Sequence, residues 1–186
     1  EYNPQKLVAS QNVLVVTISY RLGIFGWFSH PELRNRSNGL DASANFGLLD
    51  QIKALEWLRN NIENFGGDKN NITIFGESAG GQNVIALYVS PLAKGLFHRA
   101  ISQSGGITLT SIADAEDIDR VAFPLKGNYK YRHKTTKEFV NNLLNKGLIN
   151  THLNETGNIE ELTNLKATDL MLSWTSGEVW EGTTQM

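Results

Sequence analysis

The sequence predicts an α/β fold with a mostly parallel sheet flanked by helices. Two short segments, residues 12–19 and 72–75, are runs of β-branched, aromatic and other apolar residues, as strands are. Between them, residues 47–64 repeat apolar side chains at helical spacing. Strand, helix and strand in this order predict a right-handed crossover that joins two parallel strands of one sheet.

The first half of the chain contributes one of these strands and the crossover helix. Residues 12–19 are apolar on both faces, so we expect a central strand covered by helices. Residues 24–44 are rich in Gly, Ser and Asn, which suggests a packed irregular loop near the mouth of the functional site, although a plain connection between elements is the simpler expectation. The helix over residues 47–64 should end at Gly66 and Gly67. Its apolar stripe consists of Leu48, Ile52, Leu55, Leu58 and Ile62.

Residues 72–89 predict a buried strand, a sharp turn and a helix, with Ser78 where the strand becomes the helix. This pattern is typical of a nucleophile elbow. A residue on so tight a turn has a strained backbone, and the positions two before and two after it must lack side chains. Gly76 and Gly80 meet this demand.

An elbow of this kind predicts nucleophilic chemistry. The Ser78 hydroxyl should project from the C-terminal end of the sheet, in front of the N-terminus of the following helix. The N–H group of Ala79 is then placed to donate to the oxyanion that forms when a serine attacks an ester carbonyl. A phosphate-binding loop is excluded because Gln82 and Asn83, rather than Lys and Ser or Thr, follow the last glycine.

Beyond the elbow, residues 99–103 predict a short strand beside the elbow strand. The pattern then becomes polar. Two helices are expected, over residues 136–144 and 159–172, with Thr135 and Asn158 as their caps. No further strand is predicted.

Composition narrows the functional classes. The 186 residues carry a net charge of −2, which gives no electrostatic footprint for nucleic acid and suits a small uncharged substrate. With no Cys, the chain has neither disulfides nor thiolate chemistry. Its longest apolar run is too short to span a bilayer, and no cofactor or metal site is expected. Because it begins at Glu1 without Met, we expect a segment of a longer protein.

Several motifs resemble those of the carboxylesterase/cholinesterase family, the type-B carboxylesterases. They are Phe-Gly-Glu-Ser-Ala-Gly-Gly at residues 75–81, Asn-Phe-Gly-Leu-Leu-Asp-Gln at 45–51 and Gln-Ser-Gly at 103–105. The resemblance implies an α/β-hydrolase fold and a serine carboxylic-ester hydrolase that acts through an acyl-enzyme on Ser78. It also implies that residues 1–186 are an internal part of one catalytic domain, with the oxyanion loop before Glu1 and the catalytic acid and His beyond Met186. Lack of Cys indicates the bacterial branch, and the family weakly favours a secreted or periplasmic protein.

The resemblance implies that Glu77, Gly80 and Ser104 contribute to substrate binding. Glu77 matches a position that lines the pocket and interacts with the catalytic His, although a solvated carboxylate near a helix N-terminus is an equal alternative. Ser104 either joins the catalytic network or caps the end of its strand.

None of the other titratable residues is a convincing partner for Ser78. The four histidines, His30, His98, His133 and His152, are expected at the surface. The acidic run Asp114, Glu116, Asp117 and Asp119 is expected to be a solvated face or a helix start. A non-catalytic binding or adhesion protein on the same scaffold is the alternative function, and retention of Ser78 favours the enzyme.

Overall fold

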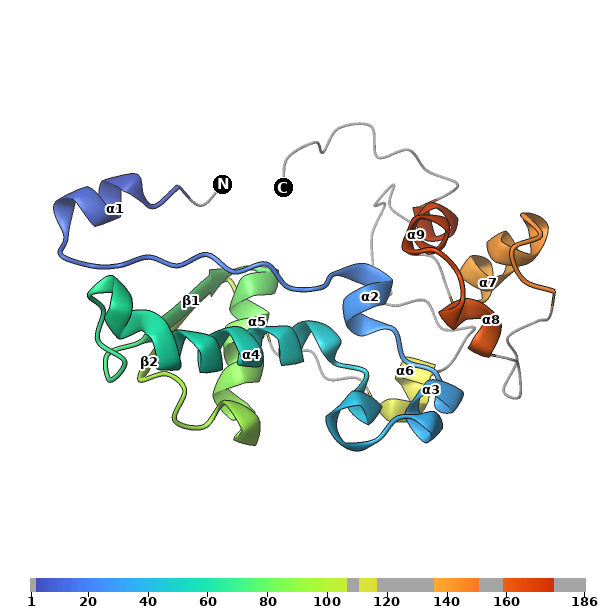
Figure 1. The fold of residues 1–186 in the computed structure, drawn as a ribbon, viewed down its shortest axis with the longest axis horizontal. Helices are drawn as coiled ribbons and strands as arrows, with labels where there is room; N and C mark the ends of the chain where they lie inside the picture. The colour runs from blue at the N-terminus through green and yellow to red at the C-terminus, as the bar shows by residue number, and fades with distance from the viewer. Residues whose placement is uncertain (1–2, 107–110, 117–135, 151–158, 176–186) are drawn as a thin grey trace. The chain divides into compact units, whose positions relative to one another are not determined.

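A computed structural model of the chain describes residues 3–106, 111–116, 136–150 and 159–175 (Figure 1). The described residues fall into two compact units. Unit 1 takes its residues from Glu1–Trp27 and Asn45–Leu109, and unit 2 from Phe28–Ala44 and Thr110–Thr184. Unit 1 contains Ser78.

Two parallel strands form the sheet of unit 1. Strand β1 spans Thr73–Glu77 and strand β2 spans Arg99–Gln103, with Ile74 opposite Ala100 and Glu77 opposite Gln103. Helix α5, Ala79–Val89, connects them, and the 3-10 helix η3, Pro91–Ala93, follows it. The predicted strand over residues 99–103, its place beside the elbow strand and the helix after Ser78 are therefore confirmed.

The core of unit 1 lies between β1, α5 and helix α4, which spans Phe46–Asn61 (Figure 1). The 3-10 helix η2, Ile62–Phe65, extends α4, and Gly66 closes it with a φ of 82°, so the predicted helix and its glycine end are confirmed. The buried core residues are Ile52, Leu55, Ile74, Val84, Leu87 and Ala93.

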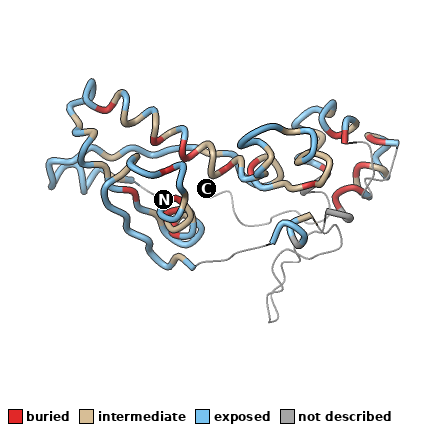
Figure 2. Tube along the Cα trace, turned by 90° about the horizontal axis from the view of Figure 1, so that it is seen from below, coloured by how far each residue is buried: buried red, intermediate tan, exposed pale blue. Residues whose placement is uncertain are grey.

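Only one face of β1 is buried. Ile74 packs into the core, whereas Phe75, on the opposite face, is 49% exposed and lies beside Ile101, which is 53% exposed. Along the described chain as a whole, short buried stretches alternate with exposed ones (Figure 2). The prediction of a buried strand is thus correct for one face of the sheet only, because the side chains of Phe75 and Ile101 on the other face stay about half exposed.

Residues 12–19 differ from the prediction. They run as an extended segment after helix α1, Gln5–Ser10, and the sheet pairs β1 only with β2 (Figure 1). The predicted central strand is therefore wrong for this structure. Its side chains Val13, Leu14, Val16 and Ile18 are all more than a third exposed. An apolar pattern specifies surroundings for side chains, but it supplies neither the neighbouring strand nor the covering helices.

The predicted irregular loop over residues 24–44 is also wrong. It contains helix α2, Gly23–Trp27, in unit 1, and helix α3, Pro31–Arg36, and the 3-10 helix η1, Gly39–Ser43, in unit 2. A local signal explains α3: Pro31 occupies its first position, where its fixed φ suits a helix, and His30 caps it.

Unit 2 is helical in its described residues. Helices α6, Ile112–Glu116, α7, Thr136–Asn145, α8, Ile159–Thr163, and α9, Ala167–Thr175, follow in order. Helix α7 confirms the prediction, but the helix expected over residues 159–172 is divided into α8 and α9. The division follows Thr163, whose hydroxyl bonds the Glu160 carbonyl. The predicted caps Thr135 and Asn158 lie outside the described residues.

No strand follows β2 among the described residues, as expected. No helix among them is long and apolar enough to cross a membrane.

Candidate active site

Ser78 stands alone between β1 and α5, and its backbone is strained. Its φ is 53° and its ψ is −113°, a conformation that L-residues rarely adopt and that costs about 1–3 kcal/mol. The residue is exposed, and its side chain makes no capping hydrogen bond to α5. The fold therefore presents the hydroxyl to solvent at the C-terminal end of β1 instead of using it to cap the helix.

The glycine requirement at the turn is confirmed on one side only. A Cβ atom on Gly76 would lie 2.5 Å from the carbonyl carbon of Gly80, so no larger residue fits at position 76. A Cβ atom on Gly80 would meet nothing within 4 Å. The expectation that Gly80 must lack a side chain is therefore wrong for the described residues, because Gly80 approaches Gly76 with its backbone only.

Strand β2 holds the turn from the other side. The Ser78 N–H donates to the Gln103 carbonyl at 2.9 Å, and the Ser102 hydroxyl donates to the Gly81 carbonyl at 3.0 Å. A Cβ atom on Gly105 would lie 2.5 Å from the Gly81 carbonyl carbon, so α5 and the end of β2 meet backbone to backbone. Sequence reasoning did not assign Ser102 or Gly105 this role, although a glycine just past a strand signals such an approach.

The other predicted site residues lie around the same edge of the sheet. Ala79 is the first residue of α5, where N–H groups have no acceptor within the helix. Glu77 is the exposed last residue of β1, and Ser104 follows β2. Because Glu77 pairs with Gln103, Ser78 and Ser104 follow neighbouring positions in the sheet. Ser104 also has a positive φ, 51°.

The two described histidines are engaged elsewhere. His98 is exposed, as predicted, and its Nδ1 accepts a hydrogen bond from the Ile72 N–H at 3.2 Å. It precedes β2 and so lies at the opposite end of the parallel sheet from Ser78, about 15 Å away along a five-residue strand. His133 and His152 lie outside the described residues.

His30, in unit 2, is buried, so the prediction of a surface histidine is wrong. It is 1% exposed, and its ring stacks on Phe28 at a centroid distance of 6.4 Å. Its Nδ1 accepts a hydrogen bond from the Glu32 N–H and thereby caps α3. Burial lowers the pKa of His30, against the opposing influence of the Glu32 and Glu116 carboxylates.

Glu116, also in unit 2, is not part of a solvated face. Its side chain is 9% exposed, and it accepts two hydrogen bonds from the Arg34 guanidinium, at 2.7 and 3.0 Å. The hydrogen bonds from Arg34 lower the pKa of Glu116. The prediction for the acidic run is therefore wrong at this residue, because the guanidinium of Arg34, 82 residues earlier in the chain, replaces water. Asp117 and Asp119 lie outside the described residues.

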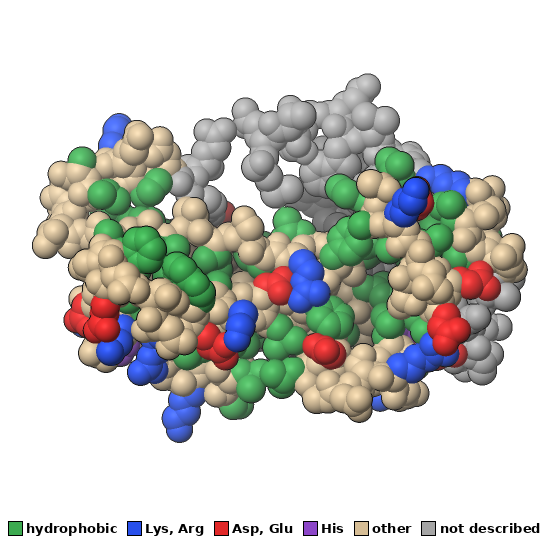
Figure 3. Space-filling view, viewed as in Figure 1, with side chains coloured by type: hydrophobic (Ala, Val, Ile, Leu, Met, Phe, Trp, Pro, Cys, Tyr) green, Lys and Arg blue, Asp and Glu red, His purple; other side chains and the backbone are tan. Residues whose placement is uncertain are grey.

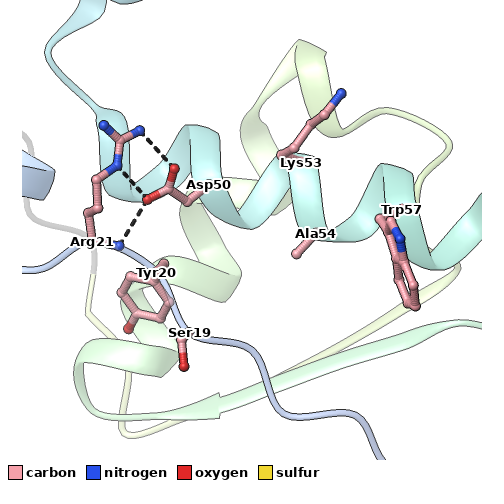
Figure 4. Close-up of a pocket in the computed structure, with 7 residues that line it drawn as sticks. All are labelled: Ser19, Tyr20, Arg21, Asp50, Lys53, Ala54 and Trp57. Carbon is pink, nitrogen blue, oxygen red and sulfur yellow. Dashed lines mark hydrogen bonds and ion pairs between the residues drawn. The ribbon is translucent and has the colours of Figure 1, made fainter.

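An open groove in unit 1 lies along α4 (Figure 4), and Ser78 is not among the residues that line it. Asp50, on its wall, accepts hydrogen bonds from the Arg21 backbone N–H at 2.9 Å and from the Arg21 guanidinium at 2.8 and 2.7 Å. The side-chain hydrogen bond from Arg21 lowers the pKa of Asp50. The groove is lined by Ser19, Tyr20, Arg21, Asp50, Lys53, Ala54 and Trp57.

Parallel strands joined through a helix, with a serine on a strained turn after the first strand, define the class of the α/β-hydrolases. The particular family follows from comparison of sequences: the sequence model of the carboxylesterase family matches residues 1–167, and the chain belongs to that family.

Mammalian enzymes and solved esterase structures are similar to this chain. Liver carboxylesterase 1 of Oryctolagus cuniculus is 54% identical over 111 residues, which are 60% of this chain and 18% of the relative. Carboxylesterase 1D of Rattus norvegicus is 52% identical over 121 residues, 65% of this chain and 20% of the relative. A structure of a thermophilic PNB esterase superposes with a TM-score of 0.59 at 34% identity, covering 83% of this chain and 26% of that one.

Two facts follow from these comparisons. The chain spans about a fifth of the length of the curated relatives it matches. The lack of Cys indicated the bacterial branch of the family. The chain nevertheless shares about half of the aligned residues with mammalian relatives, so the lack of Cys does not assign the branch.

Proposed function

We propose that this chain carries the nucleophile of a serine carboxylic-ester hydrolase, and that Ser78 forms the acyl-enzyme. The observation that carries the proposal is the Ser78 turn. A strained, exposed serine whose hydroxyl does not cap the following helix has no evident structural purpose, whereas a nucleophile needs this presentation.

In the proposed reaction, the Ser78 Oγ attacks the carbonyl carbon of an ester while a general base takes its proton. The carbonyl oxygen becomes an oxyanion, which accepts a hydrogen bond from the Ala79 N–H at the start of α5. As this intermediate collapses, the ester C–O bond breaks, the base gives its proton to the departing alcohol oxygen, and the acyl group stays on Ser78. Water then gives a proton to the same base and attacks the acyl-enzyme, the acid is released, and the base returns the proton to the Ser78 Oγ.

The base for this reaction comes from elsewhere in the protein. Among the described histidines, His98 lies at the far end of the sheet from Ser78, and His30 caps α3 in a buried site in unit 2. We propose that residues 1–186 are an internal part of one catalytic domain, and that an acid, a histidine and a second oxyanion element are supplied by the remainder of a full-length protein. The short coverage of the relatives supports this view.

A small uncharged ester is the proposed substrate. The chain is close to neutral, with 17 basic and 19 acidic residues, so its charge selects for no ionic partner. The names of the similar proteins, carboxylesterases and PNB esterases, support the same class of substrate.

Labelling with a fluorophosphonate probe tests the proposal in the full-length protein. The adduct should appear on Ser78, in the tryptic peptide of residues 70–94, and fragmentation of this peptide should separate Ser78 from Ser90. The Ser78→Ala variant should remain unlabelled. Labelling of another serine, undiminished by Ser78→Ala, would refute the proposed nucleophile.

A further inference from the structure

We propose that the hydrogen bond between Tyr20 and Asn83 positions helix α5, and through it the Ala79 N–H and the Ser78 turn, for acylation. The inference rests on the proposed function of Ser78. It assigns Tyr20 and Asn83 as positioning residues, because neither belongs to the turn itself.

The contact joins segments that are distant in the sequence. The Asn83 Nδ2 donates to the Tyr20 hydroxyl oxygen at 2.9 Å, and both side chains are half-buried. Asn is a poor residue for the interior of a helix, since its amide competes with the backbone for hydrogen bonds. At position 83, in the second turn of α5, the amide instead bonds the extended segment that precedes α2.

Tyr20 can act as an anchor because its neighbour is fixed to α4. The Arg21 backbone N–H and guanidinium both donate to the Asp50 carboxylate, and the guanidinium carbon lies 5.1 Å from the centre of the Phe46 ring. A Cβ atom on Gly47 would lie 2.8 Å from the Arg21 carbonyl oxygen, so the backbone also packs closely on α4. Figure 4 shows the Tyr20 ring on the other side of the chain from the Arg21 guanidinium.

Helix α5 is thereby held from two sides. Strand β2 binds it at Gly81, through the Ser102 hydroxyl and the close approach of Gly105. Tyr20 binds it at Asn83, two residues further along. The apolar core also packs on the helix further along, at Val84 and Leu87, but such nonpolar contacts allow small shifts that a directional hydrogen bond at Asn83 opposes. These shifts matter because Ala79 is the first residue of the same helix.

Loss of the contact should slow chemistry more than it weakens binding. An oxyanion donor acts only on the charge that develops in the transition state, so its displacement lowers kcat and leaves the KM of a small ester nearly unchanged. For p-nitrophenyl acetate and the full-length protein, we expect Tyr20→Phe and Asn83→Ala each to lower kcat by about tenfold, as small misplacements of catalytic groups do. Labelling of Ser78 by a fluorophosphonate should slow by a similar factor.

Three further variants separate positioning from general damage. If both single variants break one contact, the double variant Tyr20→Phe with Asn83→Ala should be no slower than the slower single variant. Asn83→Asp keeps an oxygen to which the Tyr20 hydroxyl can donate and should retain most of the wild-type kcat. Tyr88→Phe is the matched control: it removes a hydroxyl from the same helix at a residue that is 73% exposed, and its kcat should not change.

The possible results distinguish this inference from the proposed function. Wild-type kcat in both single variants, additive losses in the double variant, or an effect on KM alone would overturn the positioning role. If the wild-type protein is not labelled at Ser78, the proposal that Ser78 is the nucleophile is refuted, and the inference that rests on it is refuted as well. Rates are to be compared at a temperature where circular dichroism shows every variant to be folded.

Discussion

Ser78 and Gly76 place different demands on one turn. Ser78 has a positive φ in spite of its Cβ atom, because its side chain is needed there for the proposed chemistry. Gly76 does not have a positive φ. A glycine is needed there only because the Gly80 backbone occupies the space that a Cβ atom would fill. The sequence pattern Gly-x-Ser-x-Gly suggests equal roles for the two glycines, whereas the structure shows that a Cβ atom would meet neighbouring backbone only at Gly76.

We expect Gly76→Ala to destabilise the full-length protein by about 2–3 kcal/mol, because the new methyl group would overlap the Gly80 backbone. Gly80→Ala is the matched comparison. Its methyl group meets nothing within 4 Å, and replacing a helical glycine by alanine adds up to about 1 kcal/mol of stability. Urea unfolding monitored by circular dichroism measures both changes. Equal destabilisation by the two substitutions would contradict the assignment.

His30 shows a second limit of residue-level reasoning. His30 is expected at the surface because it precedes the elbow and has no evident catalytic role, yet it is 1% exposed, because it stacks on Phe28 and caps α3. A His immediately before a Pro that starts a helix was the available signal, since a ring nitrogen can accept from the first turn.

His30 should make stability depend on pH in the mildly acidic range. Burial lowers its folded-state pKa below the ordinary 6.5, so the unfolded chain takes up the proton first. Stability is therefore full above about pH 6.5 and falls as the pH drops towards the folded-state pKa. Protonation at Nδ1 would also remove the acceptor for the Glu32 N–H. The melting temperature should fall between pH 7.5 and 5.5.

His30→Asn provides the control for this pH dependence. Asn is a good N-cap but does not titrate, so the variant should keep α3 and lose part of the dependence. Parallel curves of melting temperature against pH for the two proteins would show that His30 is not responsible.

At the scale of elements, the sequence predicted which segments form helices better than it predicted which extended segments pair into a sheet. Helices α4, α5 and α7 and strands β1 and β2 follow from spacing and from glycine ends, because those signals act within a few residues of the chain. The strand over residues 12–19 failed, since a strand exists only where a neighbour completes its hydrogen bonds. Short helices between residues 23 and 43 were missed because their composition resembles that of a loop.

Asp50 supplies a test at this scale, because it fixes the extended segment to α4. We expect Asp50→Asn to destabilise the full-length protein by about 1 kcal/mol, since hydrogen bonds to a charged partner are lost while solvent screens part of the effect. The hydrogen bond from Arg21 lowers the folded-state pKa of Asp50 below 3.8. The contribution is therefore present at neutral pH and is lost as the pH falls below that value.

Urea unfolding at pH 7 and at pH 3 measures this contribution. The difference between wild type and Asp50→Asn should be larger at pH 7 and should shrink at high salt. A difference that is the same at both pH values would mean that shape, rather than charge, explains the effect of the substitution.

At the scale of the whole molecule, the described residues leave much apolar surface open. Hydrophobic side chains form several patches on the face shown in Figure 3. In unit 1 the exposed set includes Phe75, Tyr88, Val89 and Ile101, and a two-stranded sheet is marginally stable by itself in water. These surfaces match the view that the chain is one part of a larger catalytic domain.

We expect the 186-residue chain, expressed alone, to aggregate or to remain partly unfolded, and to hydrolyse p-nitrophenyl acetate no faster than its Ser78→Ala variant. Light scattering, circular dichroism and turnover assays measure the three properties. A monodisperse, cooperatively folding chain whose turnover disappears with Ser78→Ala would show that a base within these residues serves Ser78, and that the internal-segment proposal is wrong.

The arrangement of β1, α5 and β2 has a consequence for the order of folding. These elements are consecutive, and the paired residues of the two strands, such as Thr73 and Arg99, are 26 positions apart, so closing them costs less entropy than pairing with segments further away in the chain. The unit is thus suited to serve as a folding nucleus around which more distant segments assemble. Ser78 lies at its centre, and the strained turn would then form early. Substitutions that disturb the turn should chiefly slow refolding, with little acceleration of unfolding.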